Sequence, residues 1–142
     1  ARKEFQNISK CYDCGISVVT PRHVSKNILI MDFEGKNGKP ENTLLESEVD
    51  ENDYHQSIAL ISDLFKKAKL VHGDFSEYNI FKTKNGLKLF DLGSAVDTTH
   101  PNTMNFLKRD INNITNFFVK RGLTVENPAD ILERIIKWAL KN

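Results

Sequence analysis

The sequence has little of what marks several classes of protein. Cys11 and Cys14 are its only cysteines, which is too few for a disulfide framework and typical of a reducing compartment. No apolar run approaches the ~18 residues that span a bilayer, and the first residues lack the pattern of a signal peptide. The formal net charge is +1, which gives no global attraction to nucleic acid. We therefore expect a cytoplasmic protein with no membrane partner and no DNA partner.

The two cysteines form a CxxC pair, which is one half of a common zinc motif. Closing a zinc site needs two more ligands, and the histidines that could supply them form no HxxxH motif. A second CxxC is also missing from the sequence. We therefore interpret the cysteines as ordinary thiols near a helix end.

Length and composition predict one compact domain. With 142 residues and 39% hydrophobic content, the chain can bury a real core but is too short for two ordinary domains. It begins Ala1-Arg2-Lys3-Glu4, without methionine and already in a helical pattern. This start suggests that an upstream part is missing.

Apolar residues that recur every three to four positions predict helices. The expected helices are 2–13, 54–68, 107–118 and a last one that begins with the Asn127-Pro128 cap. Gly15 and Gly122 stand where glycine ends a helix. The second helix is acidic at its start and lysine-rich at its end, which complements the helix dipole.

Short apolar and β-branched runs predict strands between the helices. The expected strands are 18–19, 27–31, 79–82 and 87–90. We expect the first two to pair, with Pro21 in their connection, and the last two to form a hairpin around Asn85-Gly86. Residues 35–42, rich in Gly, Lys, Asn and Pro, indicate an exposed linker. The predicted fold class is α+β.

Two polar loops carry the residues of greatest chemical interest. Phosphoryl transfer needs a carboxylate beside the attacking hydroxyl and oxygen ligands that hold Mg²⁺ against the phosphates. Asp74 and Asn79 have the spacing of the kinase pattern H-R-D-x-x-x-x-N, and Asp91 follows the hairpin as the D-F-G aspartate does. Alone, each could be a turn former, a cap or a solvated strand end. Together they predict a phosphotransferase, with His72 as a buried imidazole that braces the loop.

These loops also resemble one kinase family closely. The string VHGDFSEYN at 71–79 is similar to the catalytic loop of RIO-type atypical kinases, in which serine replaces the usual lysine after the aspartate. The string FDLGSAV at 90–96 resembles the metal-binding loop of the branch typified by the first RIO kinase. The likeness continues through His100-Pro101 and 106–113, and it covers about residues 4–122.

The resemblance implies a kinase-like C-terminal lobe that is mostly helical with a small β-hairpin. Residues 35–142 would form this lobe, and residues 1–34 would be a remnant of the N-terminal lobe with helix C, two strands and the hinge. The cofactors implied are ATP and Mg²⁺ or Mn²⁺. Asp74 would be the catalytic base, and Asn79 and Asp91 would bind the metal. Asp91 would also be phosphorylated transiently during the reaction.

The same resemblance implies a set of nucleotide-binding residues. They are Glu4, Met31, Asp32, Glu34 and Ser76. Met31 would be the gatekeeper, and adenine would bond to the main chain of Asp32 and Glu34. Glu4 matches the helix glutamate that pairs with the ATP-gripping lysine. Without the resemblance, the hinge would be an ordinary strand end and Glu4 an exposed helix charge.

Two parts of the kinase pattern are missing from the sequence. It contains no glycine-rich loop and no lysine of a V-A-I-K strand, so we expect these residues alone to transfer phosphate poorly or not at all. Gly73 stands where many kinases keep an arginine that binds activation-loop phosphate, and the segment from Asp91 to Phe106 is short. We expect ATP hydrolysis or self-phosphorylation to matter more than phosphorylation of extended peptides.

Two other functions stay open. A small-molecule kinase of the aminoglycoside or choline type uses a similar loop, and a non-catalytic scaffold on a ribosomal precursor would use only the surface. The resemblance implies that the partner is a pre-small-ribosomal-subunit particle, with its protein and rRNA. Lys108-Arg109 and Lys120-Arg121 could contact RNA, although we favour solvated helix charges for both pairs.

Overall fold

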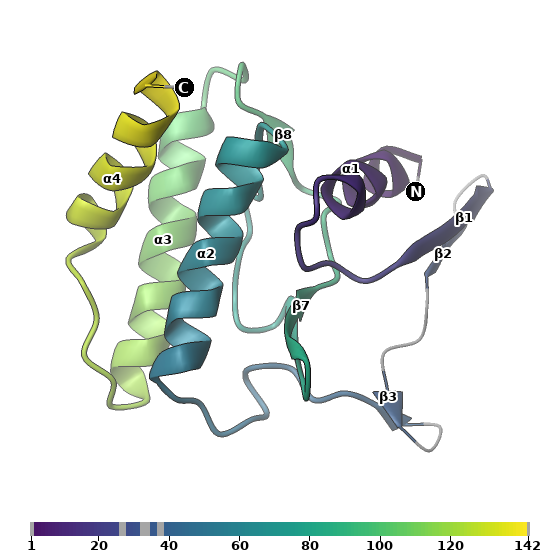
Figure 1. Ribbon diagram of the computed structural model, residues 1–142, viewed down its shortest axis with the longest axis horizontal. Helices are drawn as coiled ribbons and strands as arrows, with labels where there is room; N and C mark the ends of the chain where they lie inside the picture. The colour runs from purple at the N-terminus through teal and green to yellow at the C-terminus, as the bar shows by residue number, and fades with distance from the viewer. Residues whose placement is uncertain (1, 26–27, 32–34, 37–38, 142) are drawn as a thin grey trace.

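The computed structural model describes residues 2–25, 28–31, 35–36 and 39–141 (Figure 1). Within them the helices are α1 (Arg2–Asp13), α2 (Glu51–Lys67), α3 (Thr103–Lys120) and α4 (Pro128–Lys141). Helices α2, α3 and α4 pack side by side, whereas α1 lies apart from them and contacts the first hairpin. All four predicted helices are therefore present.

The described strands form small antiparallel pairs. They are β1 (Pro21–Ser25), β2 (Ile28–Met31), β3 (Gly35–Lys36), β4 (Lys39–Pro40), β5 (Leu70–Val71), β6 (Ile80–Thr83), β7 (Gly86–Leu89) and β8 (Val96–Asp97). The pairs are β1 with β2, β3 with β4, β5 with β8, and β6 with β7. None of the helices in the described part is long and apolar enough to cross a bilayer.

Helix α2 shows why the sequence folds as it does. The Asp50 side chain accepts a hydrogen bond from Asp53 N at 2.9 Å, and the Asp53 side chain accepts one from Asp50 N at 3.0 Å. This capping box satisfies donors that the first turn leaves open, so the helix begins at Glu51, before the first apolar residue. The predicted stripe is buried as expected: Tyr54, Ile58, Ile61, Phe65 and Ala68.

The predicted pairing of strand 18–19 with strand 27–31 is wrong. Val18 instead forms an isolated parallel bridge to Leu89, and Val19 N donates to Leu89 O at 3.0 Å. Pro21 is the first residue of β1 and lies opposite Met31 of β2, so it does not belong to the connection. Proline is tolerated at the first position of a strand, where its missing N–H costs no ladder bond.

Two other sequence expectations are sharpened by the structure. The predicted linker 35–42 contains the paired strands β3 and β4, in register Gly35 to Pro40. The predicted hairpin is confirmed, with Thr83 paired to Gly86 at its end. Gly86 has φ +114°, which favours glycine, and a Cβ there would lie 2.8 Å from Gln56 Oε1, so another residue would strain the backbone and displace the Gln56 side chain.

One hydrophobic core joins the ends of the described chain. It includes Ile8 and Cys11 of α1 and Ile131 and Ile135 of α4, all at most 2% exposed. The part predicted as an N-terminal remnant therefore packs on the same core as the helical part. The boundary predicted at residue 34 falls outside the described residues and stays a prediction.

The cysteines behave as thiols of the core and its edge. Burial raises the pKa of Cys11 to about 12, and Cys14 Sγ donates to Lys67 O at 3.6 Å. A thiol with so high a pKa is a poor metal ligand, because zinc binds the thiolate. In the described ranges, moreover, no three His, Cys, Asp or Glu side chains are grouped to hold a metal ion.

Candidate active site

The loop 72–79 leaves β5 and is held in place by α3. The Asp110 carboxylate accepts hydrogen bonds from Gly73 N at 2.8 Å and Phe75 N at 3.1 Å. Arg109 also donates to Gly73 O. The main chain is thus fixed on both sides of Asp74, whose own side chain is exposed. A carboxylate that must meet a substrate needs such an exposed side chain on a rigid backbone.

Asp110 is a functional residue that the sequence reasoning missed. It is 1% exposed, and burial raises its pKa, while its hydrogen bonds to the Gly73 and Phe75 main chain act in the opposite direction. The signal was present in the sequence, because Asp110 stands between Leu107 and Ile111 on the apolar face of the predicted helix. A charged residue on that face is rarely fully buried unless it has partners.

His72 links the two polar loops. It is 1% exposed, its Nε2 bonds to the main-chain oxygen of Asp91, and its Nδ1 accepts from Asp74 N at 3.1 Å. Its ring also packs edge-on against Phe75. The prediction of a buried, bracing imidazole is confirmed.

Asn79 joins the end of the loop to its beginning. Its Nδ2 donates to Asp74 O at 2.6 Å, and its main-chain oxygen accepts from Phe90 N at 3.1 Å. Because the amide nitrogen is engaged, the amide oxygen is the atom that remains for a cation. Ser76 supports the same turn, since its Oγ accepts from Tyr78 N at 3.2 Å and its main-chain oxygen accepts from Asn79 N.

The Asp91 loop is held mainly from α1. Asp91 is exposed, and its Oδ1 accepts from Gly93 N at 3.1 Å. Asn7 Nδ2 donates to Leu92 O at 3.2 Å, and Glu4 hydrogen-bonds to the Leu92 main chain. Burial raises the pKa of Glu4, and the Asp91 charge raises it further. Two carboxylates therefore lie close together where a cation would relieve their repulsion.

The structure connects most of the predicted site residues and leaves the hinge open. Hydrogen bonds link Asp74 to Asn79 directly and to Asp91 through His72, and Glu4 lies beside the Asp91 loop. Met31 ends β2, but its side chain is not described. The predicted hinge contacts at Asp32 and Glu34 lie outside the described residues.

The donor set suits a hard divalent cation. It comprises two exposed carboxylates, Asp74 and Asp91, and the amide oxygen of Asn79. Oxygen ligands of this kind are those that Mg²⁺ and Mn²⁺ prefer, and Mg²⁺ commonly binds through one or two carboxylates together with water and phosphate oxygens. The residues present therefore fit such an ion.

A hollow of about 720 Å³ opens beside Asp74. It is lined by the loop residues Asp74, Ser76, Glu77, Tyr78 and Asn79, by Asn113, Asn116, Phe117, Lys120 and Arg121 around the C-terminal half of α3, and by Leu45. We call it the α3 groove. No residue of the segment between Asp91 and α3 lines it, so that segment leaves the groove open.

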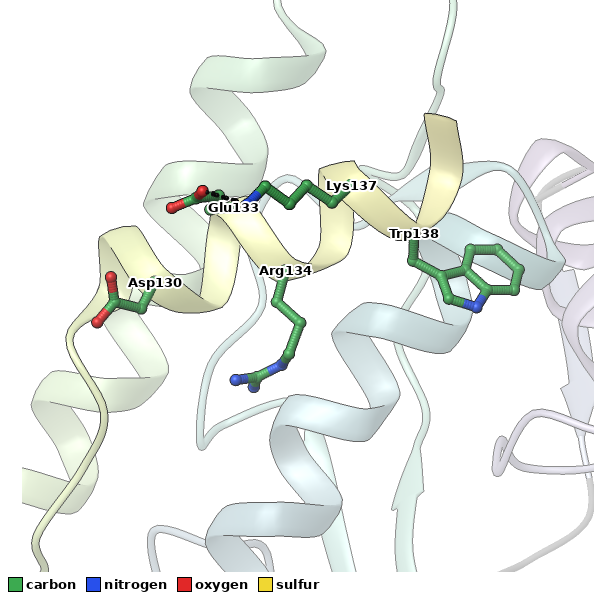
Figure 2. A pocket seen from close by; sticks show the side chains of 5 residues that line it. All are labelled: Asp130, Glu133, Arg134, Lys137 and Trp138. Atoms are coloured by element: carbon green, nitrogen blue, oxygen red, sulfur yellow. Dashed lines mark ion pairs between the residues drawn. The ribbon is translucent and has the colours of Figure 1, made fainter. Parts of the chain in front are cut away.

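A second hollow, of about 470 Å³, lies on α4 (Figure 2). Most of its charged side chains are in ion pairs, Glu133 with Lys137 at 2.8 Å and Arg134 with Glu126 at 2.6 Å. Lys66 lies 4.7 Å from the centre of the Trp138 ring. This hollow contains none of the polar loop residues, and nothing in it indicates chemistry.

The comparisons with known proteins agree with this geometry. The family model described as RIO domain matches residues 1–131. A RIO-type serine/threonine-protein kinase Rio1 of Thermoplasma acidophilum is 35% identical over 136 residues, covering 96% of this chain and 71% of the relative. The serine/threonine-protein kinase rio1 of Dictyostelium discoideum is 37% identical over 139 residues, covering 95% of this chain and 24% of the relative.

A solved structure gives the same result. The Rio2 kinase of Chaetomium thermophilum, in an ADP/Mg²⁺-phosphoaspartate complex, superposes with a TM-score of 0.75 at 26% identity, covering 94% of this chain and 43% of that chain. This chain spans only 35% of the Encephalitozoon cuniculi relative and 28% of the Caenorhabditis elegans relative. The predicted α+β, kinase-like fold is confirmed. With its four helices, its short antiparallel strand pairs and its two polar loops, the chain belongs to the RIO domain family.

Proposed function

We propose that this chain carries the metal-binding and phosphoryl-transfer loops of an ATP-dependent atypical serine/threonine kinase. The observation that carries the proposal is His72, whose two ring nitrogens join the Asp74 loop to the Asp91 loop. Two loops tied in this way keep a base and a metal ligand in a constant relation, and phosphoryl transfer depends on such alignment. The names of the kinase relatives support the same activity.

In this proposal each loop residue has one task. Asp74 accepts the proton of the attacking hydroxyl, and its main chain is kept in place by Asp110. Asn79 and Asp91 hold Mg²⁺, which supplies positive charge against the nucleotide phosphates when bound. Ser76 shapes the turn between Asp74 and Asn79, and its role in nucleotide binding rests on the resemblance alone. Glu4 pairs with a lysine that grips ATP, because a cation there offsets the repulsion between Glu4 and Asp91.

Asp91 is also proposed as a transient phosphate acceptor. One carboxylate oxygen attacks the γ-phosphorus, the bond to the β–γ bridging oxygen breaks, and ADP leaves. Water then hydrolyses the acyl phosphate. The Rio2 kinase structure that superposes on this chain is described as a phosphoaspartate complex, which supports this step. The exposure of Asp91 gives its carboxylate access to a nucleotide.

The adenine site and the cellular partner rest on the resemblance alone. Met31, Asp32 and Glu34 are proposed as gatekeeper and hinge, with adenine bonded to the main chain of the last two. The partner is proposed to be a cytoplasmic pre-small-ribosomal-subunit particle, with ATP turnover timing release. Co-sedimentation of the protein with small-subunit precursors, and its retention there by an Asp91→Asn variant, would test this partner.

The test of the proposed chemistry uses a polypeptide that includes a glycine-rich loop and its lysine, because these 142 residues contain neither. We expect Mg²⁺-dependent ATP turnover and a protein-bound phosphate that hydroxylamine releases, as it does from acyl phosphates. Asp74→Asn should lower turnover by about 10²–10⁴-fold, the usual worth of a positioned base. Asp91→Asn should abolish both turnover and the labile phosphate.

The matched control is Asp130→Asn, an exposed carboxylate of α4 far in sequence from both loops. It should keep both activities. Labile phosphate that persists in Asp91→Asn would place the acceptor elsewhere, and wild-type turnover in both loop variants would refute the proposed function.

A further inference from the structure

The α3 groove has a polarity along its length. Its Asp74 end is fixed by Asp110 and Arg109 near the middle of α3. Its other end is the C-terminus of α3, where Lys120 lines the groove. Side chains from one face of the helix run between these ends, with Asn113, Asn116 and Lys120 at i, i+3 and i+7. The groove therefore carries the Asp74 carboxylate at one end, two amides in the middle and the Lys120 cation at the far end, with the Glu77 carboxylate on the side of the loop.

Arg121 builds the wall of the groove and does not offer its charge to a ligand. Its guanidinium donates to Ser47 O at 2.8 Å and to Leu45 O at 2.5 Å, and it lies 4.8 Å from the centre of the Phe117 ring. Leu45 N in turn donates to Glu77 O at 3.3 Å. These contacts fix the segment beside Leu45 between α3 and the catalytic loop, so Lys120 is the cation of the groove that a ligand would meet.

The composition of the groove fits an extended peptide. Carboxamides such as Asn113 and Asn116 can both donate to and accept from a peptide main chain. Tyr78, 62% exposed, and Leu45, 39% exposed, offer apolar surface for a side chain. The segment after Asp91 runs back to pair with β5 through β8, which leaves this face uncovered. The short segment between Asp91 and α3 suggested that the protein has no surface for docking a peptide. The α3 groove would supply such a surface.

We propose that the α3 groove binds the acceptor polypeptide in extended form and selects an acidic residue through Lys120. Lys120 lies ten positions after Asp110, about 15 Å along the helix axis. Side chains tilt towards the helix N-terminus, and the long Lys120 side chain can reach further in that direction than the short Asp110 side chain, which shortens the span between their charges to about 10–13 Å. An extended peptide covers about 3.3 Å per residue. The acidic residue of the bound peptide therefore lies about three or four positions from the residue with the acceptor hydroxyl. It lies either always before that residue or always after it.

This inference rests on the proposed function and is tested first by binding, which needs no turnover. The probes are fluorescein-labelled peptides with one central serine. Each peptide carries a single glutamate, and the series places it in turn at each of the remaining positions. The full 142-residue chain should bind one group of them about three- to fivefold more tightly than the alanine parent, the usual worth of an exposed ion pair. That group should have glutamate about three or four residues from the serine.

Charge reversal makes the test specific. Lys120→Glu should lose the glutamate preference and favour lysine at the same position instead. The control is Lys108→Glu, an exposed lysine of the same helix outside the groove, which should keep the original preference. Thermal unfolding followed by circular dichroism should be unchanged for Lys108→Glu and slightly lowered for Lys120→Glu, which replaces a cation by an anion in the last turn of α3.

Three results would overturn the proposal. They are a glutamate preference that does not depend on position, an equal effect of the two lysine variants, and a single-stranded oligonucleotide that binds more tightly than every peptide and is released by Lys120→Glu. The two hypotheses can fail separately. Intact Mg²⁺-dependent turnover by the polypeptide with the glycine-rich loop and its lysine, without positional preference in peptide binding, refutes the groove alone. Positional binding by this chain, with no turnover by that longer polypeptide, refutes the proposed catalysis.

Discussion

The two polar loops of this protein are held by different means. The loop around Asp74 is held by α3. The buried Asp110 carboxylate and the Arg109 side chain form hydrogen bonds with its main chain. The loop around Asp91 is anchored from the side by α1, through the half-buried Glu4 and Asn7. Helix α3 lies within the packed layer of helices, while α1 stands apart from it (Figure 1). Asp74, the base in the proposed function, therefore sits on the more rigid support.

Because of this difference, the two loops should respond differently to the loss of the hydrogen bonds that hold them. Hydrogen bonds inside the core cost most when they are broken, because the groups left behind cannot reach water. Bonds at a half-exposed helix surface cost less, because water replaces the lost partner. Changes under the Asp74 loop should thus have a large effect on the stability of the whole fold, and changes on α1 should have a smaller effect that acts mainly through the Asp91 loop. His72 contacts both loops and is the route by which one can affect the other.

The largest effect is expected at Asp110. Asp110→Ala leaves the Gly73 and Phe75 N–H groups without their acceptor in the core, which should lower the free energy of unfolding by roughly 2–4 kcal/mol. Asp110→Asn keeps one acceptor oxygen and should lose about half as much. Urea unfolding measures both, and hydrogen exchange should speed up at the Gly73 and Phe75 amides. Equal stability of the alanine variant and the wild type would mean that the loop does not depend on this anchor.

The sequence predicted the parts whose signal is local. The stripe of α2, the cap of α4 and the Asn85-Gly86 hairpin each follow from residues that are neighbours in the chain. The partners of a strand are set by contacts distant in sequence, which is why Val18 was paired with the wrong strand and joins Leu89 instead. The spacing of His72, Asp74, Asn79 and Asp91 located the two loops, and the catalytic and metal-binding roles of the last three stay predictions.

What the sequence did not indicate is how the loops are supported. Asp110 lies 36 residues after Asp74 in the sequence, and only folding brings its carboxylate beneath the loop. The groove beside Asp74 likewise needs the contact of Arg121 with Ser47 and Leu45, which no local pattern contains. The charged pair Lys120-Arg121 was interpreted as solvated, yet its two members have different surroundings. Such roles depend on tertiary contacts and not on composition.

A smaller and more local effect is expected at Asn7. Asn7→Ala removes the donor to Leu92 O, whereas the bond from Ala95 N to that oxygen stays, so the free energy of unfolding should fall by about 0.5–1.5 kcal/mol. Hydrogen exchange should speed up at Gly93 and Ala95 and stay unchanged at Phe75. Gln6→Ala, an exposed neighbour on α1, is the control and should change neither. Faster exchange at Phe75 in the Asn7 variant would show that the two loops open together.

The smallest effect is expected at Glu4, and it depends on pH. Burial, and then the charge of Asp91, raise the pKa of Glu4 above its usual value of 4.5. A raised pKa means that the fold favours the protonated form, so this contribution to stability is fully present below about pH 4.5 and is lost as the pH rises through the folded-state pKa. Glu4→Gln imitates the protonated form. Without divalent cations it should unfold at higher urea than the wild type at pH 7, by about 0.5 kcal/mol after allowance for solvent screening.

At pH 4 the glutamine variant and the wild type should differ little, because the wild-type carboxyl is then largely protonated. The same substitution in an Asp91→Asn background separates the effect of burial from the effect of the Asp91 charge. In that background only the part of the rise in the Glu4 pKa that is due to the Asp91 charge disappears. Suppose that Glu4→Gln raised the stability to urea by the same amount in the Asp91→Asn background. Burial alone would then raise the pKa of Glu4, and no charge repulsion would act between α1 and the Asp91 loop. A gain that shrinks in that background would instead mean that α1 holds the Asp91 loop against a repulsion, which a cation placed between the two carboxylates would remove.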